Sequence, residues 1–343
     1  MYKKTGILIF LCLFLCANFA LTANAASIKF DKNNYYVLHK KNIRAKIKSK
    51  KKIKYWSSNN NIASIKNGKI TGKKRGSCTI YAKSRGKTCS AKVYVKANPA
   101  VNATEIPVLT WHRIVSDKDK KNLFLNNEWA GSVSDFENQI KYLKDNGYVT
   151  VTIDRFYKWY QGKATIPENA VVITFDDGYY ETYHLVYPII RKYNFAATNF
   201  IIGNWTPKVT PKYTGSQNYN RIGEDKIKET KKAYPKFDYQ SHSWNEHYMT
   251  GDTPRVLTMT RAEINEDIKK MKKFRFKYYA YPYGANNTII RSELRKNGIK
   301  MAFGFGHNGY GYAKKSNNQY NIKRIKINGQ ITMQKFAKIV NRY

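Results

Sequence analysis

Hydrophobic and polar residues alternate in short segments through residues 27–97 of the chain. The alternation has a period of two at 69–71, 78–82 and 91–95, which is typical of half-buried β-strands. Asn-Gly and Arg-Gly pairs separate these segments and favour tight turns. No helical periodicity competes in this part of the sequence. We therefore predict a small all-β sandwich over residues 27–97.

From residue 106 onward, apolar strand-like runs alternate with amphipathic helical stretches. A helix is predicted over 133–146, between an apolar run at 108–112 and another at 149–153. This alternation is typical of a mainly parallel sheet covered by helices. Strands are predicted over 108–112, 149–153, 171–175, 197–202, 237–241, 278–281 and 301–305. These seven units indicate an α/β fold built as an incomplete (β/α) barrel.

Two further segments complete the predicted domain organisation. Residues 98–105 contain Pro99 and small polar residues, which is the composition of a linker between the β sandwich and a larger domain over 106–343. The segment 321–327 resembles a closing edge strand, and 332–340 a final helix. Neither of these last elements carries visible chemistry.

The first 25 residues have the pattern of a secretory signal peptide. Lys3 and Lys4 precede an apolar run at 6–21, and residues 23–25 (Ala-Asn-Ala) supply a small-x-small cleavage site. The alternative is an uncleaved N-terminal anchor. After residue 25 no stretch approaches the roughly 20 apolar residues that a membrane span requires. We therefore expect a secreted protein, extracellular or associated with the cell wall, with no transmembrane span after cleavage.

The chain is strongly basic, with 62 Lys and Arg residues against 23 Asp and Glu residues and a formal net charge of +39. Between residues 27 and 97 there are 21 Lys and Arg residues and one acidic residue, Asp31. Such a surface attracts polyanions, but export argues against nucleic acid. We expect the lysine-rich run 48–54 to hold anionic cell-wall polymers by salt-dependent attraction. The alternative is a solvated charged face without a partner.

Two cysteines remain after removal of the signal peptide, Cys78 and Cys89. Both lie in a predicted hairpin, which could place the two thiols opposite each other and allow one disulfide. The alternative is a pair of unbonded thiols.

Adjacent carboxylates end the predicted strand at 171–175. Asp176 and Asp177 are followed by Gly178, so this site reads either as a simple Asp-Gly turn or as a pair of functional carboxylates. In a barrel of parallel strands, catalytic residues gather at the carboxyl ends of the strands.

A pair of histidines follows the predicted strand at 237–241. His242 and His247 are five residues apart, a spacing that puts them about 140° apart on a helix, so they meet at one ion only across a loop. Two imidazoles plus one carboxylate and an open position are typical of a catalytic zinc site. Taken alone, the two residues could equally be surface histidines.

The N-terminal region resembles a group 2 bacterial immunoglobulin-like domain. The resemblance rests on 55–59 (Tyr-Trp-Ser-Ser-Asn), 62–65, 67–72 (Asn-Gly-Lys-Ile-Thr-Gly) and 76–80. It implies a spacer or adhesive module over residues 27–97 rather than a catalytic one.

The larger region resembles the NodB-homology polysaccharide deacetylases, carbohydrate esterase family 4. The motifs are 174–178 (Thr-Phe-Asp-Asp-Gly), His242-Ser243 with His247, and 281–284 (Tyr-Pro-Tyr-Gly), in that order. The resemblance implies a distorted (β/α)7 barrel and a divalent metal, most commonly Zn²⁺. It implies Asp177, His242 and His247 as metal ligands, Asp176 as the general base, and the backbone N–H of Tyr283 as the oxyanion donor.

Two departures from the family pattern concern the rest of the site. Ala280 stands where the family carries the arginine that orients the base, and the spacing of the two histidines is one residue longer than usual. Both features resemble the branch of exported poly-N-acetylglucosamine deacetylases, as does 108–112 (Val-Leu-Thr-Trp-His). The resemblance to that branch implies His112 as the general acid. His307 is the alternative, because the first and seventh strands are neighbours if the barrel closes.

Further residues near the motifs are candidates for contact with substrate. Aromatic rings there can stack on sugars or wall an acetyl pocket, although aromatic residues at strand ends often serve packing instead. The candidates are Tyr281, Pro282, Trp244 and His307.

Together these features predict a secreted, monomeric, metal-dependent deacetylase that removes N-acetyl groups from N-acetylglucosamine-type glycans such as peptidoglycan, exopolysaccharide or chitin. Two alternatives remain open at this point. An O-acetyl esterase acting on xylan would use the same residues, and a non-catalytic cell-wall-binding protein would keep only the scaffold.

Overall fold

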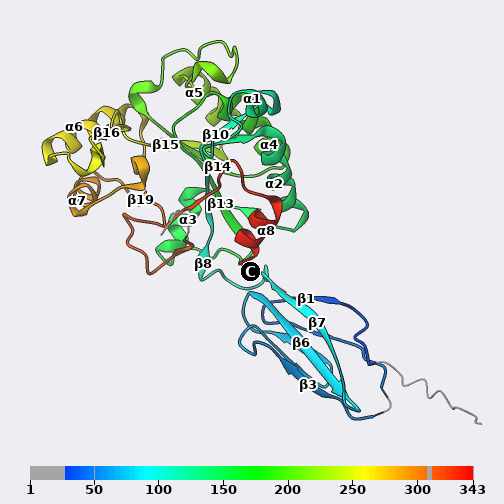
Figure 1. Ribbon diagram of the computed structural model, residues 1–343. Coiled ribbons are helices and arrows are strands. Elements are labelled where there is room, and N and C mark those ends of the chain that lie inside the picture. The colour runs from blue at the N-terminus through cyan, green and yellow to red at the C-terminus, as the bar shows by residue number, and fades with distance from the viewer. Residues whose placement is uncertain (1–27, 50, 307–310, 343) are drawn as a thin grey trace, which may run out of the picture.

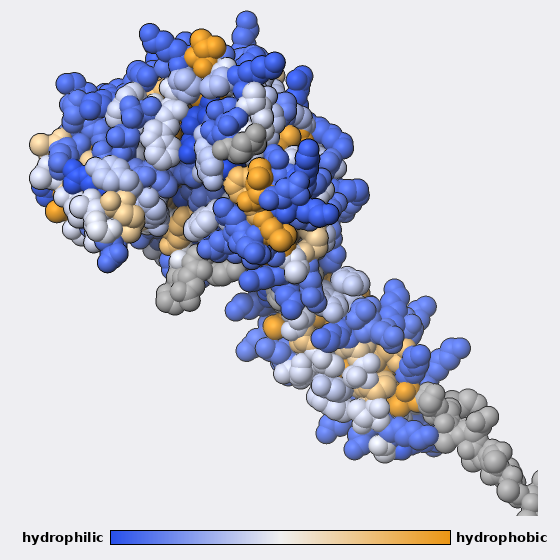
Figure 2. Space-filling model, turned by 45° about the horizontal axis from the view of Figure 1, so that its top comes forward, coloured by the Kyte–Doolittle hydropathy of each residue, from blue (hydrophilic) through white to orange (hydrophobic). Residues whose placement is uncertain are grey.

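The computed structural model describes residues 28–49, 51–306 and 311–342 and shows two domains (Figure 1). A small β domain precedes a larger α/β domain, and the C-terminal helix lies close to the junction between them. Hydrophilic side chains cover most of the face of both domains that Figure 2 shows. Residues 1–25, predicted as a signal peptide, lie outside the described residues. None of the helices in the described part of the chain is long and apolar enough to cross a membrane.

The small domain consists of two sheets that share one core. One sheet has the order β1 (Asn34–Leu38), β7 (Lys87–Lys96), β6 (Gly76–Ser84), β3 (Lys54–Ser57), and the other has the order β2 (Asn42–Arg44), β5 (Lys69–Gly72), β4 (Ala63–Lys66). Along β6, buried and partly exposed residues alternate, as a sheet with one buried face requires. The all-β architecture predicted for this region is thus present, while its assignment as immunoglobulin-like stays a prediction.

The two cysteines of the small domain are free thiols. The register of the β6–β7 hairpin pairs Cys78 with Val93 and Cys89 with Ala82. The cysteines therefore lie four positions apart along the ladder, about 13 Å at the rise of a β-strand, which is too far for a disulfide. The disulfide that the hairpin suggested is wrong, because the turn sets a different register.

The larger domain is built on a curled parallel sheet with the order β19-β18-β15-β14-β13-β9-β21. The strands are β9 (Val108–Trp111), β13 (Ala170–Phe175), β14 (Ala197–Ile201), β15 (Phe237–Ser241), β18 (Tyr278–Ala280), β19 (Met301–Phe303) and β21 (Ile325–Lys326). A short strand, β12 (Val149–Thr150), pairs with the start of β13. The predicted strands are present except at 149–153, where only Val149–Thr150 is a strand and Ile153 already begins α3 (Ile153–Tyr160). The parallel strands form the α/β architecture that the alternation of apolar runs and helices predicted.

The C-terminal segment joins the two edges of this sheet. In β21, Ile325 pairs with Leu109 of β9, and just before it Ile322 forms a parallel bridge with Phe303 of β19. The first and seventh predicted strands are therefore not direct neighbours, contrary to the expectation used for His112 and His307. The segment 322–326 lies between them, because it continues the parallel ladder on both sides.

Helices cover the sheet, and all of them except α1 bury apolar side chains. They are α1 (Asp117–Asn122), α2 (Val133–Asp145), α3 (Ile153–Tyr160), α4 (Tyr187–Lys192), α5 (Glu224–Ala233), α6 (Arg261–Met271), α7 (Thr288–Lys296) and α8 (Met333–Asn341). Side-chain caps fix several of the starts, and Thr260 with Glu263 forms a capping box at α6. The predicted helices at 133–146 and 332–340 correspond to α2 and α8.

Short elements complete the larger domain. Paired strands are β10 (Arg113–Val115) with β11 (Ala130–Ser132), β16 (Met249–Thr250) with β17 (Thr253–Pro254), and β20 (Ala313–Lys314) with β8 (Glu105–Ile106). Short helical turns are η1 (Thr182–Val186), η2 (Gly203–Trp205), η3 (Ser216–Asn218), η4 (Arg255–Leu257), η5 (Lys272–Phe274) and η6 (Pro282–Gly284).

A polar contact around Glu168 joins the two domains. The Glu168 carboxylate lies 2.8 Å from Nδ1 of His39 and accepts the backbone N–H of Asn98. Arg75 of the small domain donates to the backbone carbonyls of Glu168 and Val340. The predicted linker is therefore held against the larger domain at its first residue rather than left free.

Candidate active site

The candidate site lies at the carboxyl ends of neighbouring parallel strands. Asp176 and Asp177 follow β13, and His242 follows β15, with only β14 between these two strands. Asp177 has a left-handed backbone (φ 73°) at the start of a tight turn. At Gly178 (φ 69°) a Cβ would meet Ile201 at 3.1 Å, so this turn needs glycine both for its backbone and for its close packing.

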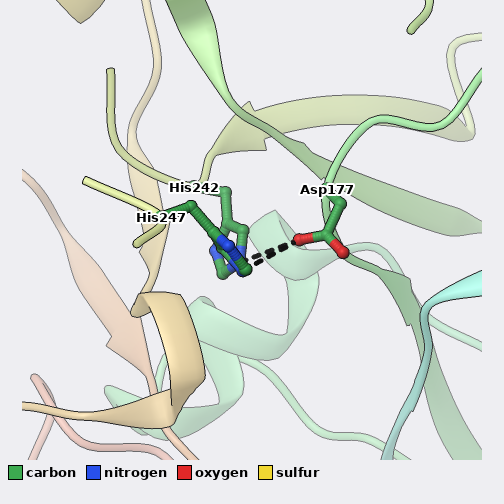
Figure 3. Close-up of side chains that lie close together, drawn as sticks. All are labelled: Asp177, His242 and His247. Atoms are coloured by element: carbon green, nitrogen blue, oxygen red, sulfur yellow. Dashed lines mark ion pairs between the residues drawn. The ribbon is translucent and has the colours of Figure 1, made fainter. Parts of the chain in front are cut away.

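Three of the predicted residues converge on one point (Figure 3). Oδ1 of Asp177 lies 3.4 Å from Nε2 of His242 and 3.2 Å from Nε2 of His247. The ligand atoms of the three residues all lie within 4.8 Å of one another. The turn after β15 brings His247 back beside His242, as the five-residue spacing required.

The donor set fits a divalent metal ion. Oδ1 of Asp177 is buried and has no hydrogen-bond partner, although a buried carboxylate oxygen normally has one. Nδ1 of His242 lies 2.8 Å from the backbone carbonyl of Ala280, which can only accept, so this nitrogen carries the proton and Nε2 is free to bind a metal. An Asp-His-His set with an open side is the ligand pattern of catalytic zinc sites.

The Asp177 carboxylate and the His247 imidazole shift each other's pKa values toward the charged forms. Burial alone would raise the pKa of Asp177, but His242 and His247 outweigh it and hold this pKa well below the ordinary value. Burial lowers the pKa of His247, and the Asp177 carboxylate more than reverses that effect, so the pKa is raised. Asp177 is therefore ionised at neutral pH, which is the form that binds a cation.

Asp176 is held by an arginine that the sequence did not reveal. Arg324 donates from Nη1 and Nη2 to the two carboxylate oxygens of Asp176 at 2.7 and 2.8 Å. The exposed fractions of the two side chains are 0% and 1%. Burial raises the pKa of Asp176, but the Arg324 charge outweighs it, and the pKa lies below the ordinary value.

Arg324 corrects the view that the C-terminal strand carries no chemistry. It occupies the segment 322–326 that joins both edges of the sheet, so it reaches Asp176 although 148 residues separate them. The absence of an arginine at Ala280 was the only hint that such a partner exists elsewhere. No local motif around Arg324 marks it.

His112 lies beside Asp176 at the end of β9. Its Nε2 is 3.9 Å from Oδ2 of Asp176, and its ring packs edge-on against Trp129 at 4.6 Å between centroids. Burial lowers the pKa of His112, although the Asp176 carboxylate opposes this. His307, the alternative general acid and a predicted substrate contact, lies outside the described residues.

Tyr283 lies beside His247, one of the candidate metal ligands. Its backbone is left-handed (φ 57°) within the turn η6, and its ring centroid is 4.6 Å from that of His247. The side chain is 46% exposed and lines the pocket described below. The turn thus brings the ring of Tyr283 to the pocket, while the role of its backbone N–H stays a prediction.

Three predicted substrate contacts do not line this pocket. Tyr281 is fully buried and donates its hydroxyl to the backbone carbonyl of Tyr320, and Pro282 is buried beside it. Trp244 packs near Gly203 and under the Lys273 ammonium. The fully buried ring of Tyr281 has no surface to offer a sugar, because it serves the core between α6 and α7.

An open pocket of about 600 Å³ surrounds the converging residues. Besides the site residues, its wall contains aromatic side chains from several loops: Phe124, Trp129, Tyr179, Tyr219 and Phe305. Apart from Tyr179, which adjoins a motif, these residues come from segments without motifs, so the sequence did not single them out. A pocket with apolar walls and a few polar groups is typical of a site for a small organic ligand.

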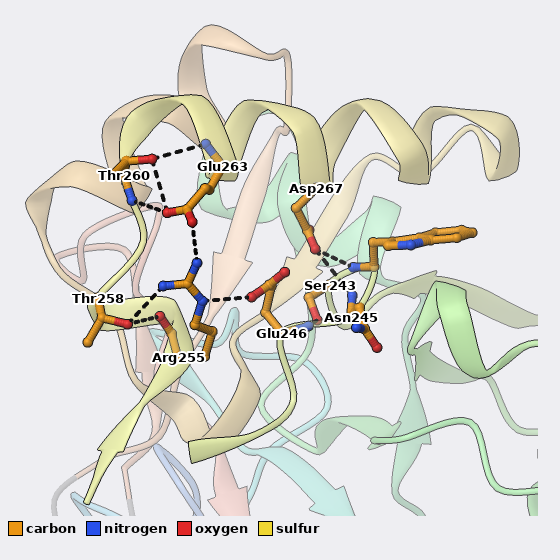
Figure 4. Close-up of polar contacts among 9 residues, drawn as sticks. Ser243, Asn245, Glu246, Arg255, Thr258, Thr260, Glu263 and Asp267 are labelled. Atoms are coloured by element: carbon orange, nitrogen blue, oxygen red, sulfur yellow. Dashed lines mark hydrogen bonds and ion pairs between the residues drawn. The ribbon is translucent and has the colours of Figure 1, made fainter. Parts of the chain in front are cut away.

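Asp267 supports the loop that carries the two histidines (Figure 4). Its Oδ1 accepts the backbone N–H groups of Trp244 and Asn245 at 2.8 and 3.3 Å. Burial, with the neighbouring Glu246 carboxylate, raises the pKa of Asp267 to about 7. Glu246 in turn pairs with Arg255. A buried acid on α6 thus positions the loop without touching the metal ligands.

The substitution Asp267→Asn is expected to change how stability depends on pH. The amide keeps an oxygen for the two backbone donors but cannot ionise. Because the folded pKa lies above the unfolded value of 3.8, the unsubstituted chain loses stability as pH rises from about 4 to about 7. Relative to it, the variant should gain up to about 4 kcal/mol over this range, at 1.36 kcal/mol per pKa unit.

Urea unfolding at pH 4.5 and pH 8 measures this gain. The exposed Asp252→Asn is the matched control and should show no such change. An Asp267→Asn difference that is the same at both pH values would contradict the assigned titration.

The fold and the site together define an α/β enzyme with a candidate metal centre at the carboxyl ends of its strands. Residues 163–302 match the family model described as polysaccharide deacetylase. This segment of the larger domain is therefore similar to polysaccharide deacetylases.

Two curated relatives carry the same description. The poly-beta-1,6-N-acetyl-D-glucosamine N-deacetylase of Staphylococcus aureus is 28% identical over 241 residues, covering 64% of this chain and 77% of the relative. The protein of that description from Staphylococcus epidermidis is 29% identical over 213 residues, covering 57% and 70%.

Solved structures share the fold. A deacetylase from Streptococcus pyogenes, in complex with acetate, has a TM-score of 0.57 at 22% identity and covers 70% of this chain and 99% of its own. A polysaccharide deacetylase from Bacillus cereus has a TM-score of 0.54 at 21% identity and covers 92% of this chain and 99% of its own.

Proposed function

We propose that this protein is a secreted, metal-dependent deacetylase that hydrolyses the N-acetyl groups of N-acetylglucosamine-type glycans. One observation carries the proposal: the convergence of Asp177, His242 and His247 beside Asp176, which is buried, ionised and outside the ligand set. The Staphylococcus relatives, named for acting on poly-beta-1,6-N-acetyl-D-glucosamine, favour an amide substrate. An exopolysaccharide of this kind is the substrate class that we favour.

The two adjacent carboxylates have different tasks in this proposal. Asp177 faces the two imidazoles and would hold the metal with them. Asp176 faces Arg324 and His112 instead, so its carboxylate stays ionised and can accept a proton from the attacking water. Arg324 fixes the orientation of this carboxylate through two parallel hydrogen bonds.

Asp177, His242 and His247 would hold the metal, and their ligand types favour Zn²⁺. When bound, such an ion polarises the acetyl carbonyl and lowers the pKa of water. The same three ligands can also bind other divalent ions. The test below therefore includes identification of the bound metal.

The remaining residues act on the charges that develop during hydrolysis. Water adds to the acetyl carbon while Asp176 takes its proton, and the backbone N–H of Tyr283 stabilises the oxyanion. His112 lies 3.9 Å from Asp176 and, in our proposal, receives this proton and passes it to the amine nitrogen as the C–N bond breaks. The products are acetate and a free amino sugar.

Acetate release tests the proposal directly. The chain from residue 27 onward is stripped of metal with a chelator, restored with zinc, and assayed on β-1,6- and β-1,4-linked N-acetylglucosamine oligomers, peptidoglycan and acetylated xylan. We expect zinc-restored release from the N-acetylated glycans. Release from xylan alone would make the protein an O-acetyl esterase, and bound metal without release from any substrate would support a binding protein.

His112→Ala is expected to lower kcat by about 10²- to 10⁴-fold, the usual contribution of a general acid, with little change in metal content. The parallel variant His307→Ala should retain far more activity. Both are assayed by acetate release on the best substrate. The reverse ranking would refute the assignment of His112.

We further propose that export follows from the signal peptide and that the small domain holds the enzyme near the cell wall. The immunoglobulin-like assignment, the monomeric state and the role of the lysine-rich run 48–54 belong to this proposal. If the protein is released from cell walls by added salt, the proposed role of the run 48–54 is supported. Association with cell walls that does not depend on salt would contradict this role.

A further inference from the structure

The four-stranded sheet of the small domain turns one face away from the core. On β6, Ser77, Thr79, Tyr81 and Lys83 alternate with buried neighbours and define this outward side. The paired strands add residues of the same phase, and we call the whole set the outer face. Its other members are Asn34, Tyr36, Leu38, Lys54, Trp56, Thr88, Ser90, Lys92, Tyr94 and Lys96.

Two aromatic pairs stand on the outer face. Tyr36 and Tyr94 stack across β1 and β7 with 5.2 Å between ring centroids and an interplanar angle of 17°. Trp56 and Tyr81 stack across β3 and β6 at 5.1 Å and 11°. Tyr36 is 56% exposed, and Trp56, Tyr81 and Tyr94 are partly exposed, so each ring offers some surface to a ligand.

The two pairs lie at a spacing that suits an extended polymer. Tyr94 is opposite Ser77 of β6, and Tyr81 is four residues further along that strand. Four residues span about 13 Å. Rings that stack on each other are also fixed in orientation, so little conformational entropy is lost when a ligand packs on them.

The outer face is positively charged without a compensating carboxylate. Lys54, Lys83 and Lys92 are exposed on it, and the Lys96 ammonium lies 4.9 Å from the centre of the Tyr36 ring. Asp31, the sole acidic residue between positions 27 and 97, is engaged by the Tyr35 hydroxyl and the Lys46 backbone N–H.

We propose that the outer face binds an anionic polysaccharide, whose sugar rings pack on the two aromatic pairs while its carboxylate or phosphate groups pair with the lysines. The choice of a glycan over other polyanions rests on the proposed function of the neighbouring domain. A second copy of the chain is disfavoured as the occupant, because it would bring the same lysines face to face. The site shares only Lys54 with the lysine-rich run 48–54.

The probe is a hyaluronan decasaccharide, which alternates N-acetylglucosamine with glucuronate, and binding to the chain from residue 27 onward is measured by titration calorimetry. Two variants test the outer face: Tyr36→Ala with Trp56→Ala, and Lys54→Gln with Lys92→Gln. The matched control, Lys66→Gln with Lys69→Gln, removes the same charge from exposed positions of the other sheet.

We expect each outer-face variant to weaken hyaluronan binding at least tenfold, and the control to change it less than twofold. Uncharged chitin oligomers should bind at least tenfold more weakly than hyaluronan. If the outer-face lysine variant and the control lost equal hyaluronan affinity, the proposal would be overturned, because binding would then depend on the overall positive charge of the domain. Full affinity without Tyr36 and Trp56, or no binding of hyaluronan at all, would overturn it as well.

Two further outcomes identify other occupants and would also overturn the proposal. Tighter binding of an oligothymidylate than of hyaluronan would indicate a nucleic-acid site, and concentration-dependent dimerisation abolished by Tyr36→Ala with Trp56→Ala would indicate self-association. Since the readout is binding, it does not depend on turnover. A chain that binds hyaluronan but releases no acetate from any substrate would overturn only the proposed function.

Discussion

Replacing Asp176 with asparagine should reduce acetate release by about 10³-fold or more while leaving the metal site intact. The amide preserves the shape of the side chain but cannot accept a proton from water. Oδ1 of Asp177 and the two imidazoles are untouched, so metal content, measured by mass spectrometry, should stay at the level of the unsubstituted chain. The comparison separates a general base from a metal ligand.

The matched variant is Asp177→Asn on the adjacent residue. It weakens the ligand set directly, so both metal content and activity should fall. Excess zinc should restore part of the activity of Asp177→Asn, but it should restore no activity to Asp176→Asn. If Asp176→Asn instead lost the metal and Asp177→Asn retained it, the roles of the two carboxylates would be exchanged.

Removing the guanidinium of Arg324 should destabilise the protein as well as inactivate it. In Arg324→Met, the Asp176 carboxylate would remain at 1% exposure without its partner. Breaking one side of a buried ion pair costs about 3 to 5 kcal/mol. Urea unfolding should report a loss of this size, and kcat should fall because the carboxylate loses both orientation and charge compensation.

A double variant distinguishes a lost ion pair from a general packing defect. In Arg324→Met combined with Asp176→Asn no charge is left unpaired, so the double variant should be more stable than Arg324→Met alone. Arg324→Lys retains charge but not the two parallel hydrogen bonds, and it should recover stability better than activity. A double variant less stable than Arg324→Met would contradict the buried-charge explanation.

Arg324 holds the Asp176 carboxylate from a different part of the chain than the arginine of the usual family motif, which would stand at position 280. Ala280 leaves no side chain to hold the base, but its backbone carbonyl orients His242. The Asp176 carboxylate, which we propose as the base, is held instead by Arg324 in the segment 322–326. A single C-terminal segment therefore joins the edges of the sheet and orients the proposed base.

The elements and the reactive residues beside them were readable from the sequence because both are local. Period-two alternation marks the half-buried strands of the small domain, and continuous apolar runs such as β13 mark strands buried on both faces. Asp176 and Asp177 come after β13, and His242 comes directly after β15. The carboxyl ends of parallel strands lie on one side of a sheet, so their convergence could be predicted as well.

Only the tertiary structure decided the features that depend on pairing between distant segments. The register of β6 and β7 separates Cys78 from Cys89, and the insertion of 322–326 between the sheet edges brings Arg324 to Asp176. The pocket aromatics also come from loops that meet only after folding. Sequence patterns record whether a residue is buried and in which element, whereas register and strand order are set by the packing of the whole domain.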